Sequence, residues 1–260
     1  SDVDRMDKFG YKTTKTGFSF GTSFEQYDDI YFSPSISTYA ETLKTSSIAS
    51  DAKKKQKGDY IESNFNYGLT LNRLNQNFQP SSGYKTTFAQ TLPIYADDMS
   101  VVNSLNVSRY FSPNENAIFS LKFLAQSVTS LGGDDVRISK RLYLPSKRLR
   151  GFESGRVGPK DGADFVGGNY ATALNFATTL PGLLPDLENI DFSFFVDAGN
   201  VWGIDYSDTL SDGNKIRSST GLAIDWLTPI GPLSFSFAQA LTKADTDKTE
   251  TFRFDIGTTF

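Results

Sequence analysis

The side chains that carry out most nucleophilic and acid–base chemistry are missing from this chain of 260 residues. It contains no histidine and no cysteine, which excludes Ser-His-Asp and Cys-His catalysis, histidine-based metal sites and a disulfide framework. Aspartate and glutamate together number 30, but no two of them have the arrangement of a glycosidase acid and base. We therefore predict that the chain is not an enzyme and has no catalytic residue, no metal site and no cofactor.

The charged residues give no strong binding signal either. The formal net charge is −4, which predicts no nucleic-acid partner. The densest basic run consists of Lys53, Lys54, Lys55 and Lys57 and falls in a long loop. Contact with lipid phosphates is one interpretation of this run, and a solvated loop is the interpretation we favour.

The segments between the turns alternate with a period of two residues. In the clearest one, Tyr60–Asn72, one face carries Ile61, Ser63, Phe65, Tyr67, Leu69 and Leu71, and the other carries Glu62, Asn64, Asn66, Gly68, Thr70 and Asn72. This alternation predicts a strand with one apolar and one polar face. We count about eleven such segments. They start near residues 17, 30, 60, 84, 100, 117, 168, 190, 217, 232 and 250.

Segment and loop lengths favour a transmembrane β-barrel over a soluble β-sandwich or barrel. Most segments run about 10 residues, enough for a tilted strand to cross a bilayer, and no run approaches the roughly 18 apolar residues of a spanning helix. The predicted loops are long at one end and short at the other, as in outer-membrane barrels, whereas a sandwich has similar connections at both ends. The long loops are 42–59, 129–167 and 203–216, and the short ones are 25–29, 112–116 and 228–231.

Two prolines interrupt the predicted strands. Pro34 and Pro93 cannot donate a backbone hydrogen bond, so we expect a bend or weak pairing at Pro34. The first four residues do not resemble a signal peptide, which export to the outer membrane requires, and we read the chain as a mature or truncated piece.

Four segments in the last half of the chain resemble those of a known family. From Lys147 the sequence reads KRLRGFESGRVGPKD, and residues 166–169 read VGGN. Residues 195–202 read FVDAGNVW, residues 221–233 read GLAIDWLTPIGPL, and residues 252–260 read FRFDIGTTF. In this order they are similar to the sixth extracellular loop and the following strands of the BamA family of outer-membrane assembly factors. The region before residue 130 matches only as alternating strands.

The resemblance implies an all-β, antiparallel transmembrane β-barrel in the outer membrane of a Gram-negative bacterium. About eleven strands of an expected barrel of about sixteen are present. Residues 1–260 would therefore be the C-terminal portion of the barrel, with 129–167 as a long loop that enters the lumen. About five N-terminal strands and the periplasmic POTRA domains would be absent.

The same resemblance implies a contact between the loop and the wall of the barrel, since the motif arginine of the family pairs with a wall carboxylate. The corresponding residues here are Arg150 and Asp197. Phe192, Phe194 and Val196 share one strand face, so Asp197 falls on the opposite face with Ser193 and Gly199. A charge-assisted pair there would hold the loop by ~1.5–3 kcal/mol. It acts as a brace, as a gate, or as both.

Further site residues follow from the resemblance. The loop motif comprises Gly151, Phe152, Glu153, Gly158, Pro159, Gly167 and Gly168. Near the position of Asn175, on the lumenal wall, the family commonly has a second acidic residue, so Arg150 depends here on Asp197 for charge. The terminal seam strand comprises Phe252, Phe254, Ile256, Gly257 and Phe260.

The implied function is the folding and insertion of β-barrel proteins through a lateral seam, where the last strand pairs with a client strand by β-augmentation. The implied partners are unfolded outer-membrane clients, outer-membrane lipid and accessory assembly lipoproteins. A related TamA or two-partner-secretion translocation barrel shares the Arg-Gly-Phe/Tyr loop and is one alternative. A porin-like channel with an open lumen is the alternative from another class, and the missing histidine counts against an outer-membrane hydrolase.

Overall fold

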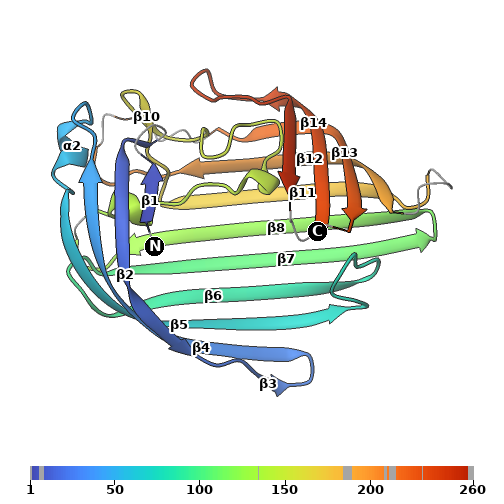
Figure 1. Cartoon of the computed structure of the whole chain (residues 1–260), viewed down its shortest axis with the longest axis horizontal. Helices are drawn as coiled ribbons and strands as arrows, with labels where there is room; N and C mark the ends of the chain where they lie inside the picture. Colours follow the sequence, from blue (N-terminus) through green and yellow to red (C-terminus); the bar gives the residue numbers. More distant parts are fainter. Residues whose placement is uncertain are drawn as a thin grey trace.

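One antiparallel sheet makes up most of the structure (Figure 1). The computed structural model of the chain describes residues 2–5, 9–133, 135–183, 189–207, 210, 215–229 and 231–256. The strands of the sheet are β1 (Asp2–Arg5), β2 (Tyr11–Gly21), β3 (Phe24–Tyr27), β4 (Ile30–Thr45), β5 (Gly58–Leu74), β6 (Gly83–Ala96), β7 (Ser100–Asn114), β8 (Ala117–Ser130), β11 (Tyr170–Leu180), β12 (Ile190–Trp202), β13 (Arg217–Thr228), β14 (Gly231–Thr242) and β15 (Phe252–Ile256).

The hydrogen-bonded order follows the chain. Over the described residues it runs β1-β2-β4-β5-β6-β7-β8-β11-β12-β13-β14-β15, with β3 paired to β4. All eleven predicted segments are strands of this sheet, which confirms the predicted all-β antiparallel class. Two strands of this sheet were not predicted, β1 and β3, because each has only four residues, too few for a period of two to stand out.

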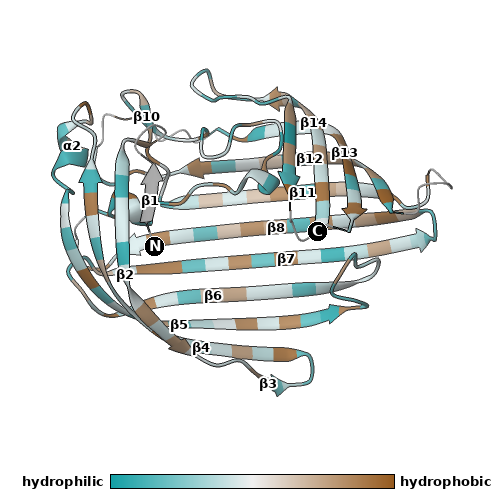
Figure 2. Cartoon of the chain, viewed as in Figure 1, coloured by the Kyte–Doolittle hydropathy of each residue, from teal (hydrophilic) through white to brown (hydrophobic). Residues whose placement is uncertain are grey.

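The alternation in β12 shows how the sheet sorts its side chains. Phe194 and Val196 are exposed on the outer face, whereas Phe195 and Asp197 are buried on the inner face. Figure 2 shows apolar and polar residues alternating along most strands. Further exposed apolar side chains of the outer face are Phe18, Phe20, Ile36, Ile61, Leu69, Leu121, Leu174, Phe176, Leu222, Phe237, Phe252, Phe254 and Ile256. An outer face of this kind matches the lipid-facing band of a transmembrane β-barrel.

The six connections considered in the sequence are long at one end of the sheet and short at the other, as predicted. The long ones are 46–57, 131–169 and 203–216, and the short ones are 28–29, 115–116 and the two-residue connection between β13 and β14. Other connections depart from this pattern, since 97–99 is short at the first end and 75–82 and 181–189 are longer at the second. The turn 75–82 joins β5 to β6. It reaches across the inner face, because Nε2 of Gln79 donates a hydrogen bond to Oδ2 of Asp191 in β12 at 3.2 Å.

The basic run at 53–57 is only partly solvated. Lys54, Lys55 and Lys57 are exposed, but Lys53 is buried and pairs with Asp164. Lys53 belongs to the short helix α2 (Asp51–Lys54), which is capped by Ser50. Ser50 donates a hydrogen bond to Asp161, so the helix contacts the segment that contains Asp164. The interpretation of the whole run as a solvated loop was therefore wrong for Lys53, because its carboxylate partner comes from a distant part of the chain.

The two strand prolines sit where ladder bonds are interrupted. Pro34 keeps its register with Tyr67 of β5. On its other side, β2 ends at Gly21 opposite Ser35 and β3 takes over. Pro34 has no backbone N–H to donate on this side, and the strand that pairs with β4 is interrupted there, between β2 and β3, as expected. Pro93 lies beside a register shift between Ser63 and Asn64 of β5.

The sheet curves around the segment 131–169, which lies along its inner face (Figure 1). This segment contains the 3-10 turns η1 (Ile138–Lys140) and η2 (Ser146–Arg148) and the short strands β9 (Lys160–Asp161) and β10 (Asp164–Phe165). Its apolar side chains form a core with small inner-face residues of the wall. The main cluster is Leu124, Leu144, Leu149, Phe152, Val157, Ala171, Ala173 and Val201. In the part of the chain that the structure describes, no helix is both long enough and apolar enough to span a membrane.

Candidate loop-to-wall site

Arg150 lies at the inward turn of the loop, just after η2, and contacts β12. Its Nε and Nη2 atoms donate to Oδ2 and Oδ1 of Asp197, both at 2.8 Å, and its backbone N–H donates to Oδ2 at 3.1 Å. The Asp197 side chain is 0% exposed and that of Arg150 is 18% exposed. The guanidinium carbon lies 3.5 Å from the ring centroid of Phe195. The structure therefore brings the two residues together as a bidentate pair largely shielded from water.

Asn175 links this pair to the preceding turn of the loop. Its Nδ2 atom donates to Oδ1 of Asp197 at 2.8 Å and to the backbone oxygen of Arg148 at 3.0 Å. The Arg148 side chain donates in turn to Oδ1 of Asn175 at 3.3 Å and to Oδ1 of Asn106 at 3.0 Å. At the position where a second carboxylate was considered, a neutral amide thus orients Asp197 and holds the loop backbone.

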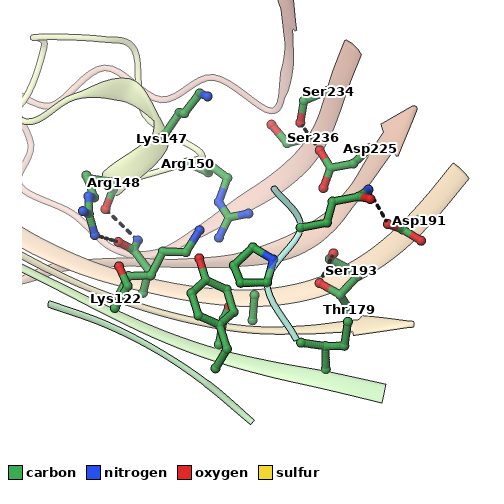
Figure 3. A pocket seen from close by; sticks show the side chains of 18 of the residues that line it. Lys122, Lys147, Arg148, Arg150, Thr179, Asp191, Ser193, Asp225, Ser234 and Ser236 are labelled. Atoms are coloured by element: carbon green, nitrogen blue, oxygen red, sulfur yellow. Dashed lines mark hydrogen bonds between the residues drawn. The ribbon is translucent and has the colours of Figure 1, made fainter. Parts of the chain in front are cut away.

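A cavity of about 370 Å³ lies beside the pair, and charges of opposite sign line different parts of it (Figure 3). Lys122, Lys147, Arg148 and Arg150 line one part, and Asp191 and Asp225 line another (Figure 3). Asp255 also lines the cavity. Asp225 accepts a hydrogen bond from Ser234 at 2.6 Å, and Asp191 accepts one from Gln79 at 3.2 Å. The hydrogen bond from Gln79 brings the turn 75–82 to the acidic part of the cavity.

The residues that follow Arg150 bind the segment before the last strand. Phe152 forms a bridge with Thr249, the N–H of Glu153 donates to the oxygen of Lys248 at 2.9 Å, and the N–H of Glu250 donates to the oxygen of Gly151 at 3.1 Å. From β15, Nη2 of Arg253 donates to the backbone oxygen of Phe152 at 3.0 Å. One short loop segment is therefore bonded both to β12 and to the residues around β15.

The remaining motif residues hold the return limb of the loop. The Pro159 oxygen accepts from the N–H of Val166 at 3.1 Å, and Gly158 lies against Val201. Gly168 exchanges backbone bonds with Leu142 at 2.8 and 3.0 Å, and Gly167 beside it lies against the Leu142 oxygen. A Cβ at Gly168 would lie 2.3 Å from the Trp202 oxygen, so this close approach requires glycine.

We expect Gly151→Ala to loosen the inward turn of the loop. Gly151 has φ +86°, and a Cβ there would lie 3.1 Å from Cβ of Ala238 and 3.2 Å from Cβ of Ser219. Backbone strain of about 1–2 kcal/mol would add to this crowding. The measurement is the rate of tryptic cleavage within the loop. Gly162→Ala is the matched control, since Gly162 also has positive φ (+61°) but nothing within 4 Å of its Cβ position. Equal cleavage rates in both variants would contradict the packing argument.

The described part of the predicted seam strand has the expected alternation. Phe252, Phe254 and Ile256 are exposed on the outer face and pair with Phe237, Phe235 and Leu233 of β14. The ring centroids of the pairs Phe235–Phe254 and Phe237–Phe252 are each 4.9 Å apart. Gly257 and Phe260 lie outside the described residues.

Three buried charge clusters of the loop region were missed from the sequence. Arg217 makes a bidentate contact with Asp247, at 2.9 and 3.0 Å. Arg141 pairs with Asp205 and donates to Oδ1 of Asn169 at 3.0 Å. The third cluster joins Arg137 to carboxylates of β4 and β5. Only the third cluster had a sequence signal, a carboxylate on the polar face of a strand, as for Glu62 in the alternating segment 60–72. Asp205 and Asp247 lie in connections, where no alternation singles them out.

The carboxyl group of Asp205 stays ionised in this setting. Burial raises its pKa, but the Arg141 guanidinium and the N–H of Val136 outweigh burial and hold the pKa below its usual range. The folded pKa is thus the lower one. The stabilisation is present above the pKa of the unfolded carboxyl and is lost as the pH falls through the folded pKa.

Comparison with known proteins gives consistent matches. The Omp85 superfamily domain matches residues 1–260. The outer membrane protein assembly factor BamA of Neorickettsia risticii (strain Illinois) is 27% identical over 256 residues, which cover 96% of this chain and 34% of that protein. BamA of Neisseria meningitidis serogroup B is 27% identical over 300 residues (96% and 37%). The human sorting and assembly machinery component 50 homolog is 27% identical over 175 residues (63% and 36%).

Two solved structures share the fold. The crystal structure of BamA from Haemophilus ducreyi lacking POTRA domains 1–3 has a TM-score of 0.85 at 23% identity, and the match covers 96% of this chain and 55% of that one. CdiB from Acinetobacter baumannii has a TM-score of 0.61 at 12% identity, covering 95% and 42%. The chain spans about a third of the length of the curated relatives it matches.

Proposed function

This chain belongs to the Omp85 superfamily, and from that membership we propose that the protein folds β-barrel proteins and inserts them into the bacterial outer membrane. The chain is similar to the BamA members of the family over 96% of its length. It lies in the outer membrane, in keeping with its apolar outer face. Its contribution to assembly would be mechanical, made by a positioned strand, and uses no bond-breaking step.

The observation that carries the proposal is the double attachment of the loop segment 150–153. On one side Arg150 pairs with Asp197 in the wall. On the other side, Phe152 and Gly151 bond the residues just before β15. β15 stands at the end of the strand order. A loop that holds a terminal strand in place is the arrangement expected where that strand must offer its free edge to a client strand.

The proposed partners follow from this role. The edge of β15 would take an extended segment of an unfolded outer-membrane protein, with backbone hydrogen bonds for affinity and side-chain alternation for register. Outer-membrane lipid would contact Phe252, Phe254 and Ile256, and accessory assembly lipoproteins would bind elsewhere on the whole protein. We also propose that residues 1–260 form the C-terminal portion of its barrel and that 129–167 enters the lumen.

Arg150→Ala tests the proposal in cells. The variant leaves the Asp197 carboxylate buried with neutral partners, so the loop should detach and outer-membrane protein levels should fall when it replaces the wild type in a depletion strain. Arg73→Ala is the control, because Arg73 and its partner Asp29 are both about half exposed and should matter little. Normal levels of outer-membrane proteins in the Arg150→Ala strain, with the variant present in the membrane, would contradict the role proposed for Arg150 in assembly.

A translocation barrel and a porin-like channel are the other functions considered. The similarity to CdiB extends to the fold alone, at 12% identity, whereas two BamA proteins match over nearly the whole chain. A porin needs an open lumen, but here the segment 131–169 packs against the inner face. Large, steady conductance of the purified protein in planar bilayers would favour the channel over the assembly function.

A further inference from the structure

The loop has a second anchor on the inner face of the sheet, several strands away from Asp197. The Arg137 side chain is 1% exposed, and its Nη2 atom lies 2.9 Å from Oε2 of Glu41 and also contacts Oε1 of Glu62. The guanidinium carbon lies 4.0 Å from the ring centroid of Tyr60. Lys140, on the next turn of the loop, places Nζ 2.8 Å from Oε1 of Glu62. Two loop cations thus converge on two wall carboxylates.

The wall side of this anchor depends on the loop for its charge balance. The Glu41 and Glu62 side chains are 0% and 2% exposed, in neighbouring strands β4 and β5. Oε2 of Glu62 accepts from the Tyr39 hydroxyl at 2.6 Å, and Oε2 of Glu41 accepts from Ser139 at 3.2 Å. Lys15 of β2 lies 3.6 Å from Glu41 on the other side. Without Arg137, buried carboxylates would lose their main partner, a strongly unfavourable state.

The two anchors fasten one short stretch of loop to separate parts of the wall. Glu62 is in β5 and Asp197 is in β12, and β6, β7, β8 and β11 separate these strands in the sheet. Between the anchors, Leu144 and Leu149 pack into the cluster that includes inner-face residues of β8, β11 and β12. Beyond the second anchor, Phe152 reaches the residues before β15. The segment therefore crosses the inside of the curved sheet and is bonded at both ends.

We propose that residues 137–153 form a cross-brace that sets the curvature of the sheet, with Arg137 as a positioning residue at one end and Arg150 at the other. A change in the contacts of Arg137 with Glu41 and Glu62 would change the distance between β4 and the β14–β15 end of the sheet. The link to client assembly rests on the proposed function, since that end carries the proposed seam. The effect of the brace on the shape of the sheet does not rest on the proposed function, because it concerns only distances within the folded barrel.

Spin-label distances test the brace directly. The chain has no cysteine, so labels can be attached at Ile36→Cys in β4 and Leu241→Cys in β14, both exposed on the outer face, in the full-length protein with any other cysteine replaced by serine. Glu62→Gln keeps the shape of the side chain but removes its charge. Arg137→Lys keeps the charge but cannot span both carboxylates. We expect each variant to broaden the distance distribution and shift it from that of the parent.

Asp29→Asn is the matched control, since it also removes one carboxylate charge, but from an exposed pair with Arg73, and it should leave the distribution unchanged. Heat-modifiable migration in gels confirms that each variant is folded before labelling. Unchanged distributions in both folded variants would overturn the brace, whether or not the protein assembles clients. Altered distances together with normal client assembly would support the brace and contradict only its link to the proposed seam.

Discussion

Arg137→Ala is expected to lower the free energy of unfolding by about 3–5 kcal/mol, the usual cost of removing one partner of a buried ion pair. The guanidinium is the group that contacts Glu41 and Glu62 together, and its removal would leave both carboxylates buried, with Lys15 beside Glu41 and Lys140 beside Glu62. The lost stacking on the Tyr60 ring adds to the effect. Few single substitutions in this chain should cost as much.

The measurement is urea-induced unfolding of the full-length protein in detergent, followed by tryptophan fluorescence. Arg73→Ala provides the control, because it truncates the same side chain at an exposed pair and should change the midpoint little. The double change Arg137→Met with Glu62→Gln should recover part of the loss, since it removes one buried charge from each side. A loss below about 1 kcal/mol for Arg137→Ala would mean that water reaches the carboxylates.

Asp197→Ala is expected to release the inward turn of the loop, at a cost of about 3 kcal/mol or more. Asp197 accepts two hydrogen bonds from the Arg150 side chain, one from its backbone N–H and one from Asn175. All of these donors would remain inside the folded protein with their acceptor gone. Asp197→Asn keeps one acceptor oxygen and should lose less.

Limited trypsin digestion of the protein in detergent measures the release, because Arg148 and Arg150 are cleavage sites only when the loop leaves the wall. Cleavage should be fastest for Asp197→Ala, slower for Asp197→Asn and slowest for the wild type. Asp59→Ala is the control, since Asp59 is exposed and accepts a single hydrogen bond from Thr42. If Asp197→Ala is cleaved no faster than Asp59→Ala, other contacts of the loop suffice to hold it.

These two substitutions affect opposite ends of the same loop segment. The segment stabilises the wall because it covers the inner face of the sheet. The inner face of a single curved sheet has no second sheet to pack against. The loop supplies that missing layer with Leu144, Leu149 and Phe152, which pack on small wall residues such as Ala171 and Ala173. Its cations then neutralise the wall carboxylates. Fold stability and loop position therefore depend on the same contacts.

Much of this architecture could be predicted from the sequence. A period of two residues is a local property, so it located eleven strands and assigned Asp197 to the inner face opposite Phe194 and Val196. The resemblance of the Arg-Gly-Phe and Asp-Ala-Gly-Asn-Val-Trp segments to those of the BamA family then implied Arg150 and Asp197 as partners, and in the structure Nε of Arg150 lies 2.8 Å from Oδ2 of Asp197. The strand pattern assigned the face of Asp197, whereas the pairing itself came from the resemblance.

The tertiary structure alone decided which distant residues share the inside of the sheet. Alternation placed Glu62 on a polar face, but its pairing with Arg137 depends on how far the sheet curves and on the path of the loop. The same holds for the bridge from Phe152 to Thr249 and for buried Lys53 against Asp164. Such contacts join segments far apart in the chain, and no local pattern encodes them, because curvature and register are properties of the whole sheet.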